Sequence, residues 1–101
     1  MAATLSLVVR PDWLSGWFLR VCAVPFVLID GEEHRAAWNR PLRLGLPSGR
    51  RLVGAGIRYR GTQALLGYHP TVIDVRPNEE IRMVAQNGPL NSEPFYVRAV
   101  P

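Results

Sequence analysis

Apolar and polar residues alternate over short stretches of this chain, and turn-forming residues separate one stretch from the next. The alternation is clearest in RLVGAGIRYR (residues 51–60), where Val, Ala, Ile and Tyr fall on one face of an extended strand and two glycines and two arginines fall on the other. The glycines at 54 and 56 indicate a bend or a close neighbour on that second face. Similar strand patterns cover residues 4–10, 17–24, 26–29, 32–38, 42–46, 71–76, 81–85 and 95–100, with Pro25 as a bulge, a break or an edge marker.

Turn residues divide these strands, and the strongest signal is Asp30-Gly31 after the apolar run Val27 to Ile29. A type I′ hairpin turn needs positive φ at both central residues, which Asp-Gly readily adopts. Short strands at this spacing, with no convincing helix, indicate a sandwich or a small barrel. We expect a compact antiparallel β-sandwich of about seven or eight short strands, forming one domain over residues 1–101. The other predicted turns and the longest predicted loop lie at Pro47 to Gly49, Pro77 to Glu79, Asn87-Gly88 and residues 61–70.

The composition supports one globular domain and limits its chemistry. A chain of 101 residues that is 48% hydrophobic can build one core. Cys22 is the sole cysteine, so we expect no internal disulfide, no clustered zinc site, and a buried, unreactive thiol. The apolar run at residues 17–29 is interrupted by Arg20 and Pro25 and is too short to span a membrane, and residues 1–9 lack the basic start of a signal peptide. We therefore expect a cytoplasmic protein with no cofactor and no membrane contact.

All 12 basic residues are arginines, and the net charge is +4. They are spread from Arg10 to Arg98, which argues against a basic nucleic-acid-binding tail or helix. If the strand from Arg51 paired with the strand from Leu42, several guanidinium groups would share one surface able to bind carboxylates or phosphates. The favoured alternative is a solvated face whose arginines are balanced by acidic residues. The members of this candidate Arg face are Arg43, Arg50, Arg51, Arg58 and Arg60.

Two carboxylates and an imidazole lie close together in the sequence around the predicted hairpin turn. Asp30, Glu32 and His34 would share one face of an unbroken strand, and with His69 they could hold a divalent ion. Gly31 opposes this interpretation, because the turn breaks the common face. We expect a hairpin with solvent-facing polar residues and no metal site.

Aromatic side chains offer a third candidate surface. Trp17 and Trp38 lie in predicted strands, where core packing is the common use, whereas Trp13 lies in a connection and is expected to be exposed. Tyr68 and His69 lie at the end of the longest loop, a frequent place for binding contacts. Because the chain has no P-loop, no dinucleotide-binding glycine motif and no nucleophile elbow, we expect no catalytic residues and no enzyme.

The segment from Phe26 to Arg82 resembles the PEGA-type β-domain family. An apolar strand runs into an Asp-Gly turn, a polar strand returns, and a leucine-bearing strand enters an L-P-x-G turn before a basic strand that ends near a tyrosine. The resemblance implies a small Ig-like sandwich used as a non-catalytic accessory or interaction module, and it assigns no site residues. The segments that carry it are Val27 to Gly31, Leu46 to Gly49, Arg50 to Tyr59, Val72 to Arg76 and Pro77 to Glu79.

These features predict a non-catalytic interaction or structural module that works through protein–protein contacts, with self-association as one form of it. An unpaired edge strand would permit strand addition, and the first and last strands are the expected edges. The first alternative is binding of an anionic ligand or nucleic acid through the candidate Arg face. The second alternative is a metal-dependent site at Asp30, Glu32, His34 and His69.

Overall fold

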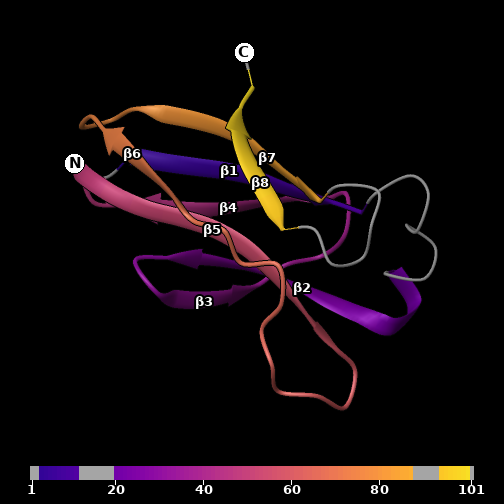
Figure 1. Cartoon of the computed structure of the whole chain (residues 1–101). Coiled ribbons are helices and arrows are strands. Elements are labelled where there is room, and N and C mark those ends of the chain that lie inside the picture. Colours follow the sequence, from indigo (N-terminus) through magenta and orange to yellow (C-terminus); the bar gives the residue numbers. More distant parts are fainter. Residues whose placement is uncertain (1–2, 12–19, 88–93, 101) are drawn as a thin grey trace.

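The computed structural model describes residues 3–11, 20–87 and 94–100, and its strands form two stacked four-stranded sheets (Figure 1). Sheet A has the strand order β4-β1-β7-β8, and sheet B has the order β3-β2-β5-β6. The strands of sheet A are β1 Ala3–Arg10, β4 Pro41–Leu46, β7 Glu80–Asn87 and β8 Phe95–Ala99. The strands of sheet B are β2 Ala23–Ile29, β3 Glu32–Arg35, β5 Gly49–Tyr59 and β6 Thr71–Val75. The predicted all-β sandwich is confirmed, with eight strands in the described part of the chain.

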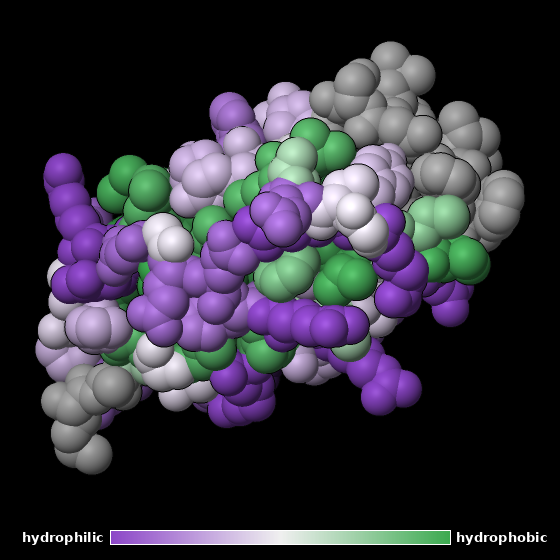
Figure 2. Space-filling model, turned by 90° about the horizontal axis from the view of Figure 1, so that it is seen from below, coloured by the Kyte–Doolittle hydropathy of each residue, from purple (hydrophilic) through white to green (hydrophobic). Residues whose placement is uncertain are grey.

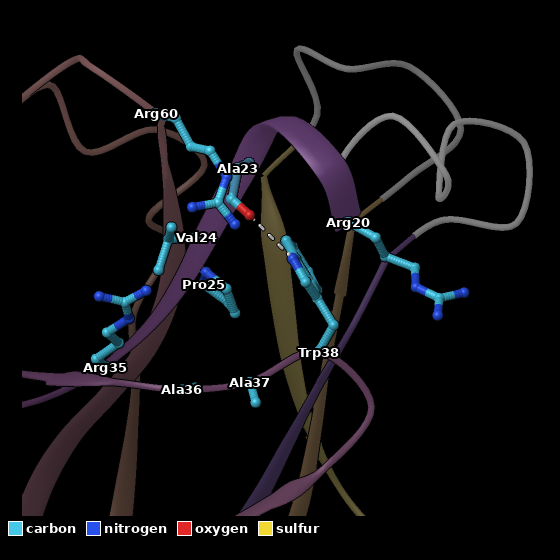
Figure 3. Close-up of a pocket in the computed structure, with 9 residues that line it drawn as sticks. All are labelled: Arg20, Ala23, Val24, Pro25, Arg35, Ala36, Ala37, Trp38 and Arg60. Carbon is cyan, nitrogen blue, oxygen red and sulfur yellow. Dashed lines mark hydrogen bonds between the residues drawn. The ribbon is translucent and has the colours of Figure 1, made fainter.

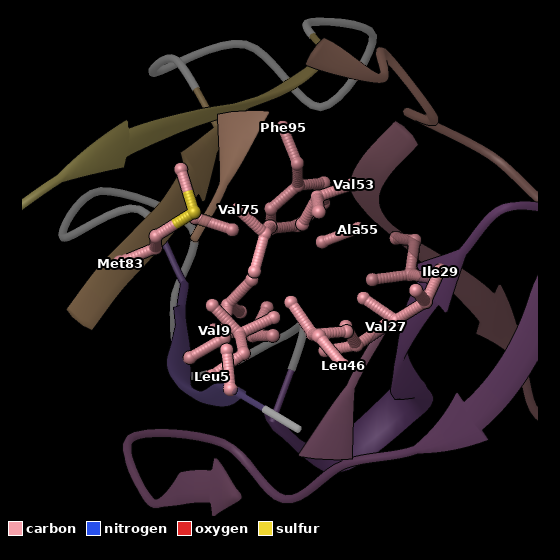
Figure 4. Close-up of a cluster of buried hydrophobic side chains, with 14 of the residues drawn as sticks. Leu5, Val9, Val27, Ile29, Leu46, Val53, Ala55, Val75, Met83 and Phe95 are labelled. Carbon is pink, nitrogen blue, oxygen red and sulfur yellow. The ribbon is translucent and has the colours of Figure 1, made fainter. Parts of the chain in front are cut away.

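The hydrophobic core lies between the two sheets and is built from alternate residues of the strands (Figure 4). In β1, Leu5, Leu7 and Val9 are fully buried, while the residues between them are only half-buried. Leucine and β-branched side chains at every second position thus cover the inner face of each sheet. The largest fully buried side chains are Phe95, Leu5, Leu7, Leu46, Val9, Val27 and Val53.

Strand pairing is mostly antiparallel, as predicted, but β1 and β7 are parallel. Because β1 pairs with β4 on one side and β7 on the other, the prediction that the first strand is an edge is wrong. The last strand, β8, pairs with β7 alone among the described strands and is an edge, as predicted. The alternation of apolar residues reports which face of a strand is buried, and it carries no information on which neighbours a strand has.

β4 and β5 lie in different sheets, although only Pro47 and Ser48 separate them. The chain crosses from sheet A to sheet B at this turn, where Gly49 has a φ of 110°. The crossing lets Leu46 of β4 and Val53 of β5 both reach the core from opposite sheets. These two strands therefore do not pair, and the condition under which the candidate Arg face would have formed is not met.

Residues 20–22 form a helical turn, so the strand predicted over residues 17–24 is wrong at this point. Strand β2 begins at Ala23, and residues 17–19 lie outside the described part of the chain. This run is apolar without alternation, and periodicity cannot separate helix from strand in such a run. Cys22 is half-buried, which corrects its expected full burial.

The predicted Asp30-Gly31 hairpin turn is confirmed. Asp30 has a φ of 50° and Gly31 a φ of 85°, as a type I′ turn requires. The Asp30 carboxylate accepts hydrogen bonds from the Leu52 N–H (2.8 Å) and from Arg51 Nη1 (3.1 Å). The turn is thereby attached to β5 as well as joining β2 to β3.

The remaining predicted turns are confirmed where they are described. Asn78 has a φ of 63° in the turn between β6 and β7, and the Glu79 side chain accepts a hydrogen bond from the Arg76 N–H at 3.0 Å. Asn87 is the last residue of β7, and Gly88 lies outside the described residues.

The loop at residues 61–70 covers the outer face of β5. Leu66 exchanges two backbone hydrogen bonds with Ile57 of β5, with N···O distances of 2.8 and 2.9 Å. The Tyr68 ring lies over Gly54, where a Cβ atom would overlap it. The predicted close neighbour of the β5 glycines is thus confirmed, and its identity is this loop.

The same loop reaches sheet A. The Phe95 N–H of β8 donates to the Gly67 carbonyl at 2.8 Å, and Phe95 is buried in the core. This loop, which connects β5 to β6 in the sequence, therefore also links β5 of sheet B to β8 of sheet A through main-chain hydrogen bonds.

Candidate functional site

Strand β3 leaves sheet B early, opposite Pro25 of β2. The Ala36 N–H donates to the Pro25 carbonyl (3.0 Å), but Pro25 has no N–H to donate in return. A hydrogen-bonded antiparallel pair normally makes two such bonds, so this pair keeps one of them. β3 ends at Arg35, and the chain beyond it crosses to sheet A. Pro25 itself lies within β2, which continues unbroken from Ala23 to Ile29 between β3 and β5, so the predicted break at Pro25 is wrong; what ends there is the pairing of β2 with β3.

Trp38 completes this crossing. Its backbone pairs with Val9 of β1, and the Asn39 N–H donates to the Val9 carbonyl at 2.9 Å. The indole Nε1 of Trp38 donates to the Ala23 carbonyl of β2 (3.1 Å). This side-chain hydrogen bond lies where the main chain of a longer β3 would have paired with β2. The indole ring is half-buried and lies 6.1 Å from the Phe95 ring, which confirms its predicted packing against the core.

A pocket of about 270 Å³ opens where β3 has separated from β2 (Figure 3). Its wall is small or apolar around the Trp38 ring, and arginines stand at its margin. The apolar wall consists of Ala23, Val24, Pro25, Ala36, Ala37 and Trp38, and the margin consists of Arg20, Arg35 and Arg60.

Two of these arginines stand close to Val24. Figure 3 shows the guanidinium groups of Arg35 and Arg60 extending toward Val24, whereas that of Arg20 extends away from the pocket. Arg60 donates from Nε to the Val21 carbonyl at 2.9 Å, which leaves its two terminal nitrogens available. Neither Arg35 nor Arg60 forms an ion pair with another residue in the described ranges.

A second hollow of about 280 Å³ lies beside the first, on the outer face of sheet B. Val24, Arg35 and Arg60 line both hollows and form the wall between them. Seen from the side of the molecule on which β2 and β3 lie, hydrophilic side chains are spread over hydrophobic surface (Figure 2). Phe26 and Thr62 also line the second hollow.

Arg58 also lines the second hollow, but its charge is compensated. Its terminal nitrogens donate to both Glu33 carboxylate oxygens (2.6 and 2.8 Å), and its Nε donates to the Gln63 carbonyl (3.0 Å). Its guanidinium carbon lies 4.8 Å from the centre of the Phe26 ring. The hydrogen bonds between the two side chains lower the pKa of Glu33 and raise the pKa of Arg58.

The structure divides the candidate Arg face. Ion pairs hold three of its members elsewhere: Arg43 with Glu80, Arg50 with Asp74 and Arg51 with Asp30. Arg58 and Arg60 lie at the site, and Arg35, which sequence reasoning missed, completes it. The two-residue turn at Asp30-Gly31 sets the register of the hairpin and places Arg35 opposite Phe26. The sequence could therefore have placed Arg35 on the same outer face as Phe26.

The acidic and imidazole candidates are not gathered in one place. Asp30 is engaged by β5, Glu32 lies 3.8 Å from His34, and His69 lies in the long loop with its ring 5.1 Å from that of Tyr96. The part of the chain that is described contains no group of three or more His, Cys, Asp or Glu side chains that could hold a metal ion.

The aromatic candidates have separate positions. Trp13 lies outside the described residues. Tyr68 is half-buried against Gly54, which is a packing contact, while His69 is exposed beside Tyr96 of β8. Neither Tyr68 nor His69 lines the two hollows at Arg35.

Comparison with protein-family models, with curated proteins and with solved structures gave no match to this chain. Among the described residues, no helix has the length and apolar character needed to cross a membrane.

Proposed function

We infer that this chain is a non-catalytic interaction module that binds an acidic segment of another protein through the outer face of sheet B. The observation that carries the proposal is the position of Arg35 and Arg60 at the wall between two hollows, without an ion-pair partner among the described residues. Two neighbouring guanidinium groups repel each other, and a carboxylate bound between them removes that repulsion and accepts their N–H groups in pairs.

The lining of the Trp38 pocket supports binding over catalysis. Its described wall holds arginine, alanine, valine, proline and tryptophan, and it holds no carboxylate, imidazole, hydroxyl or thiol. A general base or a nucleophile would have to come from those groups. The PEGA-type resemblance, which implies an accessory module, points in the same direction and stays a prediction.

The small number of free cations favours a protein segment over nucleic acid. Proteins that bind duplex DNA tightly neutralise about 6–10 phosphates. Here, among the described residues, only Arg35 and Arg60 direct unused terminal N–H groups at the site. The guanidinium group of Arg20 extends away from the pocket, Arg58 is compensated by Glu33, and three other arginines are paired elsewhere. An acidic protein segment is therefore the proposed ligand, and the binding experiment below also tests nucleic acid.

The test is the binding of fluorescein-labelled poly-L-glutamate, followed by fluorescence anisotropy as NaCl is raised. We expect binding at low salt that weakens steadily toward about 0.15 M ionic strength, because screening reduces attraction between exposed charges. The double variant R35A/R60A should bind at least about tenfold more weakly, since each lost charged hydrogen bond is worth about 1.5–3 kcal/mol.

The matched control is R82A/R98A, which removes the same charge from exposed arginines of sheet A. It should retain binding. Equal losses in the two double variants would mean that net charge alone drives binding, and no binding of polyglutamate at low salt would contradict the proposal outright. Preferential binding of an RNA or DNA oligonucleotide, lost in R35A/R60A, would replace the acidic segment with nucleic acid as the ligand.

A further inference from the structure

We propose that Arg35 and Arg60 clamp a single carboxylate, and that the Trp38 pocket takes an aliphatic side chain of the same peptide, within two residues of the acidic one. This inference rests on the proposed function and specifies its ligand. It assigns two different chemical tasks to two adjacent places: the outer face of sheet B at Arg35 and Arg60, and the edge of the sheet where β3 has separated from β2.

The clamp is defined by which N–H groups remain free. Arg58 has used its Nε and both terminal nitrogens on Gln63 and Glu33, so it supports the site without offering a donor fork. Arg60 has used only Nε, and Arg35 makes no hydrogen bond to a described residue. Both side chains line both hollows, so one carboxylate seated over Val24 can reach both.

The Trp38 pocket is suited to an apolar side chain. Its volume of about 270 Å³ is below the range of about 300–1,000 Å³ typical of pockets for drug-sized ligands, so it fits one side chain better than a whole small molecule. The single polar group of the indole is already bonded to the Ala23 carbonyl. Pro25 has no N–H, and apart from the three arginines at the margin the remaining wall is alanine and valine. Against the inner part of this wall, away from the arginines, a polar side chain would find no hydrogen-bond partner among the described residues, whereas an aliphatic one would pack on the indole ring.

The two sites share a wall, which sets the spacing of the ligand groups. Val24 lines the Trp38 pocket and also lies beside both free guanidinium groups. Consecutive Cα atoms of a peptide are about 3.8 Å apart, so side chains one or two residues apart can occupy the clamp and the pocket together. A free phosphate would satisfy the clamp alone and leave the pocket empty.

The test uses three blocked tripeptides, with binding followed by two-dimensional ¹⁵N NMR of the Val24 amide and the Trp38 indole N–H. The probes are Ac-Glu-Ala-Leu-NH₂, its neutral analogue Ac-Gln-Ala-Leu-NH₂ and its polar analogue Ac-Glu-Ala-Ser-NH₂. The first should bind about tenfold more tightly than either analogue, because each analogue lacks one of the two contacts, the charged hydrogen bonds or the leucine side chain.

Two variants separate the two tasks. Arg35 is exposed, so the folded state should tolerate R35Q. R35Q should remove the preference for Glu over Gln and keep the preference for Leu over Ser. Ala36 is half-buried opposite Pro25, so A36V should narrow the pocket and do the reverse. R82Q on sheet A is the control and should change neither preference.

The outcomes distinguish this inference from the proposed function. If polyglutamate binds through Arg35 and Arg60 but the three tripeptides bind equally, the pocket assignment is wrong and the proposed function stands. If neither polyglutamate nor the tripeptides bind, both fail. If inorganic phosphate displaces Ac-Glu-Ala-Leu-NH₂ and the leucine makes no difference, the clamp is a simple anion site and the peptide ligand is overturned.

Discussion

Single residues decide how closely the chain can approach itself on the outer face of β5. Gly54 and Gly56 are both buried there, although the inner face of β5 already faces the core. A β-strand residue with no Cβ leaves room for a second layer of chain, and the loop carrying Leu65 and Tyr68 occupies that room.

Replacing Gly54 with alanine should destabilise the protein. The new Cβ would overlap the Tyr68 ring and lie 3.1 Å from the Pro70 Cα atom, and backbone cannot move aside cheaply. Overpacking of this kind costs about 1–3 kcal/mol in the free energy of unfolding. Urea denaturation followed by fluorescence would measure it. The control is G45A in β4, where no atom lies within 4 Å of the added Cβ, and equal stability of the two variants would contradict the packing seen here.

At the residue scale, the sequence predicts the glycines and the turn but only part of the candidate site. Asp30-Gly31 and Gly54 could be interpreted locally, because a turn conformation or a missing Cβ has one physical cause near in sequence. Arg35 could not be selected in that way, because what distinguishes it is the absence of a carboxylate partner among the described residues, and that depends on how the strands are arranged in space. Which arginines meet carboxylates depends on sheet membership, as Arg43 and Arg58 show by pairing in different sheets.

At the scale of elements, the β2–β3 hairpin is attached to β5 by the side chain of its own turn. The hydrogen bond from the Leu52 N–H is the main cause of the lowered pKa of Asp30, and the hydrogen bond from Arg51 adds to it. A carboxyl group whose pKa is lower in the folded protein than in the unfolded chain stabilises the fold when it is ionised. That contribution is present above the unfolded pKa and is lost as the pH falls through the folded pKa.

The free energy of unfolding should therefore fall as the solution is acidified below about pH 4, and it should fall less steeply in the variant D30N. Asparagine can still accept the Leu52 N–H but does not titrate. Urea unfolding at a series of pH values would compare the two slopes. Because Glu33 also has a lowered pKa, D30N/E33Q should be flatter still, and parallel curves for all three proteins would contradict the assignment.

Edge strands are the elements on which self-association would depend. The sequence suggested the first and last strands, and the structure leaves β8 as an edge but places β1 between β4 and β7. Pairing through β8 stays a prediction. The sandwich itself could be predicted from the alternation and the turns. The assignment of strands to sheets could not, because a connection as short as Pro47-Ser48 can join two strands of one hairpin or, as here, two strands of different sheets.

At the scale of the whole molecule, sheet A joins distant parts of the chain. Thr4 in β1 pairs with Glu80 in β7, in the one parallel ladder among the described strands. Such a pair cannot form until most of the chain between its members has been gathered, and the loss of chain entropy precedes the gain from contacts.

Refolding should accordingly be slow and cooperative, in the range of roughly milliseconds to seconds that is typical of non-local β-folds. Stopped-flow dilution from urea, followed separately by tryptophan fluorescence and by far-ultraviolet circular dichroism, would measure the rate. The two signals should give one common rate constant. Microsecond refolding, or sheet signal that appears well before the fluorescence change, would contradict this expectation.

The absent N–H of Pro25 makes the proposed binding surface depend on one position in the sequence. Any other residue at this position would restore a donor facing Ala36 and remove one obstacle to a longer β3, whose main chain would then occupy the mouth of the pocket. A descendant sequence could keep both arginines and the tryptophan and still lose the pocket through a change at residue 25 alone. The proposed function therefore predicts that the identity of residue 25 separates variants that bind acidic peptides from variants that do not.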